Sequence, residues 1–194
     1  LVSGSAVGIY GSRGDEVLKE DAALGNDFLA QVCKECEQEA DKAKEFQLRV
    51  VHIRTGVVLS AAGGALRKML LPFKMGLGGR IGDGRQWFPW IHEDDIAGII
   101  THCIETDSIV GSVNANSPGI VTNLGFTKAL GKVLRRPTLV PVPIFVIRIL
   151  FGEMSSILFS SHRTSPQKIQ EFGYVFQHNE IEAALMACLC GAKT

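Results

Sequence analysis

The sequence has no excess of charge of either sign and no apolar run long enough to cross a bilayer. Lys and Arg together number 20, as do Asp and Glu, so the formal net charge is zero. This balance argues against electrostatic capture of nucleic acid or of an anionic membrane surface. The longest apolar stretch, Leu139–Phe151, is interrupted by Pro141, Pro143 and Arg148, and it is shorter than the roughly 20 residues of a spanning helix. We expect a soluble protein with neither nucleic acid nor membrane as a partner.

Cysteine is scarce, and its odd number excludes a simple secreted disulfide framework. The five cysteines fit a reducing compartment. The cytoplasm is predicted, with an organelle left open because the chain starts at Leu1 and shows no true N-terminus. Cys33 and Cys36 fall inside a predicted helix, without the turn that lowers the pKa of a redox thiol. Cys188 and Cys190 are poorly spaced to complete a zinc site with them, so no metal site is predicted.

Several common functional motifs are also missing. The sequence contains no G-x-G-x-x-G, no P-loop and no G-x-S-x-G nucleophile elbow. The glycines between positions 76 and 84 approach the first motif, but their spacing differs and no predicted strand leads into them. The chain therefore has no recognisable cradle for a dinucleotide pyrophosphate and no serine-hydrolase nucleophile.

The N-terminal third contains a strand–helix–strand pattern. Leu1–Tyr10 is small and apolar, which predicts a buried strand, and Arg49–Leu59 is rich in β-branched residues without polar alternation, as in a strand covered on both faces. Asp27–Phe46 between them has helical periodicity. Its predicted core face consists of Phe28, Val32, Cys36, Ala40 and Ala43. This order predicts a βαβ unit with two neighbouring parallel strands and a right-handed crossover.

The remaining sequence predicts more helix than strand. One further strand is expected at Gly111–Asn116, and Thr122 is a plausible cap for the helix that follows it. We divide the chain at Arg136 into residues 1–136, a partial dinucleotide-binding domain, and residues 137–194, a C-terminal lobe. Helices are predicted over Ala65–Met75, Asp94–Glu105, Asn123–Arg135, Pro143–Phe159, Pro166–Gly173 and Asn179–Cys190.

Two groups of segments carry a resemblance to a known family. The first is SGSAVGIYG (Ser3–Gly11) with RTGV (Arg54–Val57). The second is GDGRQWFPWIHEDDIA (Gly82–Ala97), GGALRKMLLPFKMGLGG (Gly63–Gly79) and RTSPQKIQEFGYVFQ (Arg163–Gln177). Together they resemble the epimerase-like family of atypical, extended short-chain dehydrogenases/reductases, some of which are described as nucleoside-diphosphate-sugar epimerases or cell-division inhibitors.

The resemblance implies an α/β fold that comprises the C-terminal half of a doubly wound parallel, Rossmann-like sheet and a small helical substrate lobe. Members of the family bind NADP(H), but their N-terminal glycine-motif half has no counterpart in this sequence. We therefore expect a fragment that does not bind NADP(H) tightly by itself.

The same resemblance assigns candidate site residues. Ser5, with Ser3 as the alternative, matches the catalytic Ser/Thr, and Tyr10 is either a displaced acid or a buried tyrosine with a satisfied hydroxyl. The implied cofactor contacts are Ser3, Gly4, Ser5, Ala6, Arg54, Thr55, Gly56 and Val57, with Arg54 equally open to a role as a paired arginine. Arg85, Trp87 and Trp90 are substrate candidates, against aromatic packing as the alternative for the two tryptophans. His92, Asp94 and Asp95 are expected to support a helix start.

One departure from the superfamily bears on activity. The Tyr-x-x-x-Lys pair that serves ordinary members as acid/base and ribose contact is absent, and aligning Glu37 with the family's helix glutamate puts Leu29 and Cys33 at those positions. The sequence therefore leaves alternatives open. The first is an NADP(H)-dependent oxidoreductase or epimerase-like enzyme acting on an unknown carbonyl or alcohol. The second is a non-catalytic NADP(H)-binding sensor or scaffold. The third is an inactive fragment whose sheet edge invites homo-oligomer formation.

Overall fold

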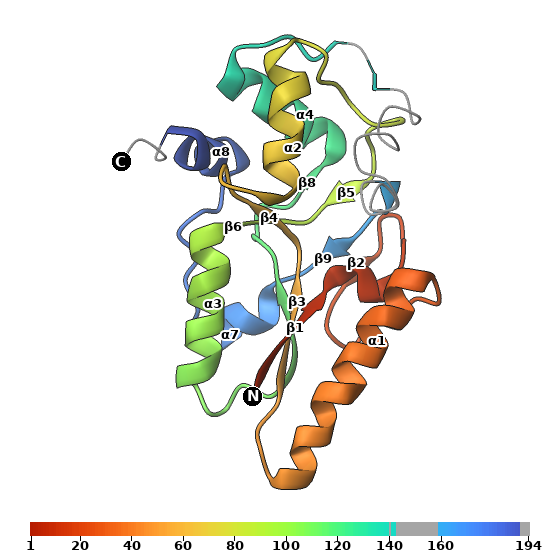
Figure 1. Cartoon of the computed structure of the whole chain (residues 1–194), viewed down its shortest axis with the longest axis vertical. Helices are drawn as coiled ribbons and strands as arrows, with labels where there is room; N and C mark the ends of the chain where they lie inside the picture. Colours follow the sequence, from red (N-terminus) through yellow and green to blue (C-terminus); the bar gives the residue numbers. More distant parts are fainter. Residues whose placement is uncertain (140, 143–158, 191–194) are drawn as a thin grey trace.

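A computed structural model describes residues 1–139, 141–142 and 159–190 of the chain (Figure 1). Its central feature is a parallel sheet of β1 (Val2–Ala6), β3 (Val51–Thr55) and β7 (Gly111–Ala115), in the order β1-β3-β7. Ser5 pairs with Arg54, and Arg54 pairs in turn with Asn114. The prediction that the first two strand segments are parallel neighbours is confirmed.

Both predicted strands of the βαβ unit are shorter than expected. The first ends at Ala6, and Val7–Tyr10 forms the 3-10 helix η1. Its neighbour β3 ends at Thr55, directly opposite Ala6, so no ladder remains to hold the next residues extended. The second strand is divided at Gly56 into β3 and β4 (Val57–Leu59), and β4 pairs with β6 (Trp90–His92) instead of the central sheet.

Helices cover both faces of the central sheet (Figure 1). On one side lies α1 (Phe28–Asp41), which is extended by the 3-10 helix η2 (Lys42–Phe46). On the other lie α3 (Glu93–Glu105) and α7 (Gln167–Glu171). Their apolar side chains meet Val51, Ile53 and Val113 of the sheet in one core cluster. This arrangement is the doubly wound, Rossmann-like architecture that the sequence predicted.

A second core lies beyond the carboxyl ends of the strands, among three further helices. It joins α2 (Gly64–Lys74), α4 (Asn123–Leu134) and α8 (Ile181–Cys190) to β4 and β6 around the buried Trp90. Residues from both sides of the predicted boundary at Arg136 share this core, and that boundary stays a prediction. Short pairs complete the fold: β2 (Val17–Leu18) with β9 (Arg163–Thr164), and β5 (Trp87–Phe88) with β8 (Val121–Thr122).

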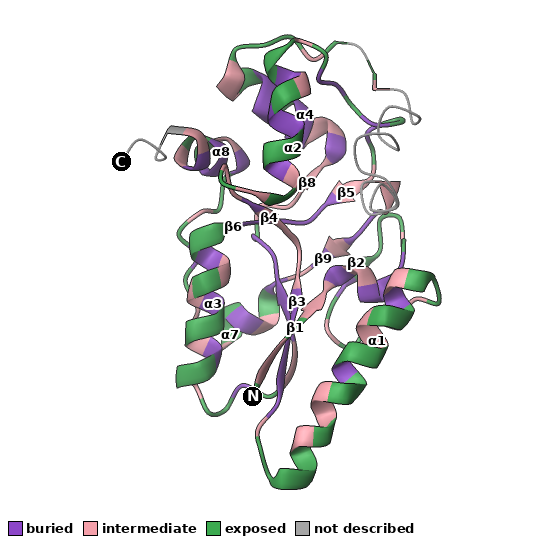
Figure 2. Ribbon diagram, in the orientation of Figure 1, coloured by how far each residue is buried: buried purple, intermediate pink, exposed green. Residues whose placement is uncertain are grey.

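Helix α1 buries a different face from the one that its apolar pattern predicted. Phe28 is 75% exposed and Val32 41% exposed, whereas Ala30 and Glu37 are buried. Figure 2 shows that most of α1 is exposed or intermediate, with little of it buried. The reason is electrostatic, because the buried guanidinium of Arg54 on β3 requires a carboxylate on the facing helix, and Glu37 supplies it. The prediction of Phe28, Val32 and Cys36 as core residues is therefore wrong, since Cys36 is exposed as well.

Several helix predictions agree with the structure. Thr122 caps α4 by accepting a hydrogen bond from the Gly125 backbone N–H, as predicted, and Asp27 caps α1 through Ala30. The predicted helix Pro143–Phe159 lies almost entirely outside the described residues. Within the ranges described above, no helix combines the length and the apolar character needed to cross a membrane.

Candidate functional site

The division between β3 and β4 creates the space for a site. The Val57 N–H donates to the Pro89 carbonyl, and the Gly56 N–H donates to Ala115. A Cβ at Gly56 would lie 2.5 Å from the Pro89 oxygen, so this close approach of two backbones requires glycine. As a result β4 leaves the central sheet, and a gap opens between the carboxyl ends of β1 and β3 and the segment around β5.

A cavity of about 310 Å³ occupies this gap. Its volume is at the lower end of the range for small-molecule sites, and its lining is mainly apolar or small, as such sites usually are. Ligands of open α/β sheets bind beyond the carboxyl ends of the strands, which is where this cavity lies. Among the described residues its lining consists of Ala6, Val7, Gly8, Asp27, Leu29, Cys33, Thr55, Gly56, Val57, Gly64, Ala65, Lys68, Trp87, Phe88, Pro89, Ser160 and His162.

Some of the predicted cofactor contacts line this cavity and others do not. Ala6, Thr55, Gly56 and Val57 are part of its wall. Ser3 and Gly4 instead line a separate surface depression beside β1, together with residues of α3. Ser5 and Arg54 do not line the cavity; their side chains instead bond Glu37 of α1 in a buried polar network.

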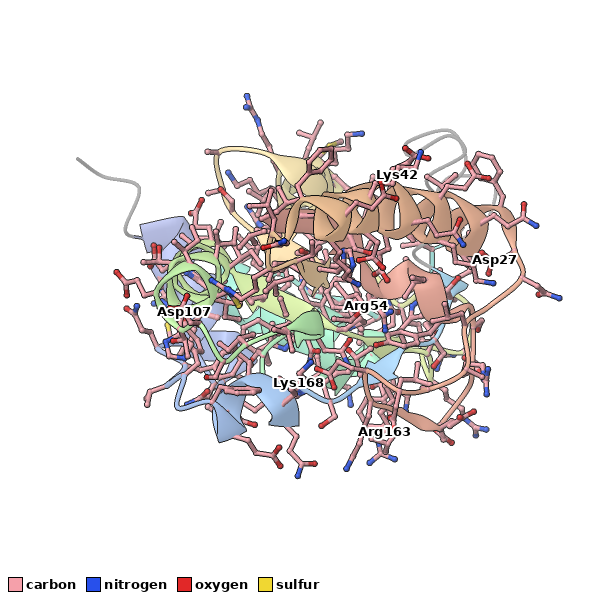
Figure 3. The ribbon with its side chains drawn as sticks, turned by 90° about the horizontal axis from the view of Figure 1, so that it is seen from below. Asp27, Lys42, Arg54, Asp107, Arg163 and Lys168 are labelled. Atoms are coloured by element: carbon pink, nitrogen blue, oxygen red, sulfur yellow. The ribbon has the colours of Figure 1, made fainter. Side chains whose placement is uncertain are left out.

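This network connects Ser5, Glu37, Arg54, Tyr10 and Asn114. The Ser5 hydroxyl donates to Glu37 Oε1 at 2.7 Å, and Arg54 donates two hydrogen bonds of 2.9 Å to the same carboxylate. Arg54 Nη1 also donates to the Tyr10 hydroxyl at 3.0 Å, and that hydroxyl donates to Asn114 Oδ1 at 2.7 Å. Figure 3 shows Arg54 in the middle of the molecule, beneath α1.

The electrostatics of the network hold its groups in fixed protonation states. Burial opposes ionisation of Glu37, but the hydrogen bonds from Arg54 and Ser5 outweigh it and keep the pKa of Glu37 below its ordinary value. Burial likewise acts to lower the pKa of Arg54, and its bonds to Glu37 and Tyr10 reverse the effect and raise it. Burial raises the pKa of Tyr10 in spite of the nearby guanidinium, so the phenol stays protonated at neutral pH.

The predicted catalytic hydroxyls are thus engaged away from the cavity. Neither Ser5 nor Tyr10 belongs to its lining, and Tyr10 is fully buried with its hydroxyl both donating and accepting. By contrast, Leu29 and Cys33, which stand at the Tyr and Lys positions of the resemblance, both line the cavity. The described wall of the cavity therefore has a leucine and a cysteine at the positions that the resemblance aligns with Tyr and Lys.

Of the three predicted substrate residues, one lines the cavity and two do not. Trp87 lines the cavity, and its indole N–H donates to Asp15 at 2.7 Å while Arg163 stacks on its ring at 4.6 Å. Trp90 is fully buried in the core, with its indole N–H donating to the Gly119 carbonyl. Arg85 is exposed and is not part of the lining.

The acidic segment at the start of α3 fixes the C-terminal part of the chain. Asp95 is completely buried and accepts hydrogen bonds from the Tyr174 hydroxyl and from the backbone N–H groups of Gln177 and His178. His92 Nδ1 accepts from the Asp94 N–H, and its ring stacks on His178 at 3.7 Å. A potential ligand atom from each of His92, Asp94 and His178 lies within 4.8 Å of the others, but the His92 Nδ1 lone pair is already used by the helix cap.

Four polar residues of the described lining were missed by sequence reasoning: Asp27, Lys68, Ser160 and His162. Asp27 was identified only as the start of a helix, and Lys68 lies on α2 in what is otherwise an amphipathic pattern. His162 precedes β9, far along the chain from the strands that form the site. No local motif marks it, because its position depends on the pairing of β9 with β2.

Comparison with known proteins finds relatives that are named as epimerase family proteins. Residues 142–188 match a family model described as "Domain of unknown function (DUF1731)". The chain is 39% identical over 189 residues to "Epimerase family protein SDR39U1 homolog, chloroplastic" of Arabidopsis thaliana, covering 97% of this chain and 54% of that protein. It is 41% identical over 186 residues to "Epimerase family protein Mb2239" of Mycobacterium bovis, covering 95% and 62%.

A solved structure supports the same grouping. The crystal structure of human epimerase family protein SDR39U1 (isoform 2) with NADPH superposes with a TM-score of 0.86 at 35% identity, over 95% of this chain and 63% of that one. The chain thus spans between about half and two-thirds of the length of these similar proteins.

Proposed function

We propose that the cavity of this chain, which is 39–41% identical to proteins named as epimerase family proteins, receives the nicotinamide end of NADP(H) together with a small alcohol or carbonyl substrate. The proposal makes the natural full-length protein an NADP(H)-dependent oxidoreductase or epimerase-like enzyme. The observation that carries it is the position of the cavity, at the carboxyl ends of β1 and β3, with Leu29 and Cys33 in its wall.

The lining fits one end of the cofactor and not the whole of it. Small residues, Ala6, Gly8 and Gly56, leave room for a flat ring beside the strand ends, and Thr55 offers a hydroxyl at the same edge. Lys68 is the single cation among the described lining residues, and the sequence has no glycine-rich phosphate loop. We therefore expect this chain by itself to bind NADP(H) weakly, because the pyrophosphate would lack a cradle.

The residues of this chain would position the reactants and exclude water. Trp87, Phe88 and Pro89 close one side of the cavity, and Leu29 closes another, so a bound substrate would be held in a largely apolar space. The cofactor, when bound, supplies the hydride chemistry, which no side chain of this chain provides. The buried network of Ser5, Glu37, Arg54 and Tyr10 would hold β1 and β3 against α1 and so keep the cavity wall in place.

A second candidate function is a non-catalytic NADP(H)-binding sensor or scaffold. The specific observation in its favour is that the hydroxyls of Ser5 and Tyr10 are committed to the buried network, so neither faces the cavity. Cofactor binding without turnover across a panel of carbonyl compounds and alcohols would favour this candidate over the enzyme.

The test of cofactor placement uses a pair of cysteines on α1. Cys33 lines the cavity, whereas Cys36, one turn further along the helix, is exposed. In the natural full-length protein we expect Cys33→Trp to weaken NADPH binding at least about tenfold, which is about 1.4 kcal/mol. Cys36→Trp should leave the affinity unchanged. Calorimetric titration of both folded variants measures this, and an unaltered affinity in Cys33→Trp would remove the nicotinamide end from the cavity.

We also propose a compartment and a kind of partner for the protein. The cytoplasm is proposed, and an organelle is equally compatible, since one relative is named as chloroplastic. The expected partner is a small-molecule substrate. Self-association is proposed only through the unpaired edge of β1, which pairs with β3 alone among the described strands.

A further inference from the structure

Among the polar side chains of the described lining that the buried network does not use, His162 combines burial with a ring that can exchange a proton. His162 is buried, with 5% of its surface exposed, yet it lines the cavity. Its backbone N–H donates to the Trp87 carbonyl, which fixes the residue beside β5. Within the described part of the chain, its ring nitrogens make no hydrogen bond with another residue.

An imidazole that lines a cavity and bonds no described side chain has its ring nitrogens available to a ligand in that cavity. The titratable groups that share the described cavity wall with the ring are Asp27, Cys33 and Lys68. Burial lowers the pKa of His162 to about 4, against the opposing charge of Asp27. At neutral pH the ring is therefore neutral, with one nitrogen that donates and one that accepts.

On the basis of the proposed function, we infer that His162 is the residue that exchanges a proton with the substrate oxygen in this cavity, and that the substrate is an apolar secondary alcohol or its ketone. The position is supported by geometry, since His162 and the Tyr- and Lys-equivalent residues Leu29 and Cys33 line the same space. A neutral imidazole can polarise a carbonyl through its N–H or accept a hydroxyl proton through its other nitrogen.

The proton and electron balance of the step is simple. In the oxidative direction the ring nitrogen of His162 accepts the hydroxyl proton of the alcohol, and the C=O bond forms as the carbon-bound hydrogen leaves with its electron pair for NADP⁺. The imidazolium then returns its proton to solvent. The overall products are the ketone, NADPH and one proton, and the reverse sequence reduces the ketone.

The substrate class follows from the rest of the lining. Leu29, Val57, Ala65 and Phe88 present apolar surface, and Lys68 is the single cation of the described wall. A sugar nucleotide would require several donors for its hydroxyls and a cationic clamp for its diphosphate. Arg85, the substrate candidate for that role, is exposed outside the cavity.

The first experiment observes the ring directly and does not require turnover. Imidazole nitrogen resonances of the natural full-length protein are recorded at pH 7 with added cyclohexanol or cyclohexanone, and His162→Gln identifies the relevant signals. We expect the His162 signals to shift with each probe. They should shift by the same amount in the control variant His102→Gln, because the His102 ring contacts the Phe172 carbonyl and does not line the cavity. His162 signals that stay fixed at saturating probe would overturn the inference.

The second experiment measures catalysis. NADP⁺-dependent oxidation of cyclic secondary alcohols should fall by about 10²-fold or more in kcat for His162→Gln, the usual share of a general acid/base. The low-pH limb of the rate profile should disappear, and NADPH affinity should be retained. A variant with the wild-type rate and pH profile would contradict the inference. Wild-type protein that binds NADPH without any turnover would instead contradict the enzymatic form of the proposed function, and the resonance experiment would still decide whether His162 meets the ligand oxygen.

Discussion

Neutralising Glu37 should destabilise this protein far more than neutralising a carboxylate in an ion pair of similar length on the helix surface. The Glu37 and Arg54 side chains are 12% and 5% exposed, and two hydrogen bonds of 2.9 Å join them. In Glu37→Gln the Arg54 charge stays buried without a counter-charge. Glu39 is the matched control, because it lies on the same helix and pairs with Lys42 at 2.7 Å, but both side chains are more than half exposed.

The magnitude follows from burial. Removing one partner of a buried ion pair costs about 3–5 kcal/mol, whereas an exposed pair is worth about 0–1 kcal/mol. For a domain of this size each kcal/mol lowers Tm by about 2–4 °C. We therefore expect Glu37→Gln to lower Tm by about 6–20 °C and Glu39→Gln by no more than about 4 °C.

Urea denaturation followed by circular dichroism across a pH series gives the free energy of unfolding and an independent check. Because the folded-state pKa of Glu37 lies below its ordinary value of 4.5, its contribution to stability is present above about pH 4.5 and is lost as the pH falls through the folded-state pKa. The difference between wild type and Glu37→Gln should therefore shrink below pH 4.5. Equal losses for Glu37→Gln and Glu39→Gln at pH 7 would refute the claim that this ion pair organises α1 against the sheet.

Two further substitutions test the elements that frame the site, each measured by urea denaturation. Gly56→Ala places a Cβ 2.5 Å from the Pro89 oxygen and should lower the free energy of unfolding by about 1–3 kcal/mol. Gly63→Ala is the control, because its Cβ meets nothing within 4 Å, and it should change this free energy by less than about 0.5 kcal/mol. Similar losses in both variants would contradict the argument that two backbones approach closely at Gly56. Asp95→Asn weakens three buried hydrogen bonds, so it should lower the free energy of unfolding by about 1–3 kcal/mol and speed proteolysis after α7. Asp107→Asn, whose side chain is fully exposed, should change neither quantity. Unchanged proteolysis in Asp95→Asn would show that Asp95 does not anchor that segment.

Much of the architecture could be predicted because its signals are local. Runs of β-branched residues at Arg49–Leu59, helical periodicity and a capping threonine at position 122 depend on residues close together in sequence, and they gave the parallel βαβ unit and the helix starts. The buried face of α1 could not be predicted in this way. Its pattern favoured Phe28 and Val32, but the decisive partner, Arg54, lies on a different element.

The candidate site shows the same limit more sharply. The family resemblance assigned Ala6, Thr55, Gly56 and Val57 to the cofactor, and these residues line the cavity. Ser5 lies on the same strand as Ala6, one residue earlier, and strand alternation directs it to the opposite face, where Glu37 accepts its hydroxyl proton in a hydrogen bond. A family motif fixes which residues are near the ligand, but the face that each one presents depends on partners elsewhere in the chain.

That alternation also explains why the proton donor must be sought outside the first two strands. Once Glu37 and Arg54 are buried together, the hydroxyls of Ser5 and Tyr10 complete their hydrogen bonds within the network, and turning either toward the cavity would leave a buried polar group unsatisfied. Leu29 and Cys33 leave the usual acid/base positions without a suitable side chain. Among the described residues of the cavity wall, His162, from the segment before β9, is the imidazole that we propose for proton transfer. Under the proposed function, the acid/base role therefore belongs to the C-terminal part of the chain and not to α1.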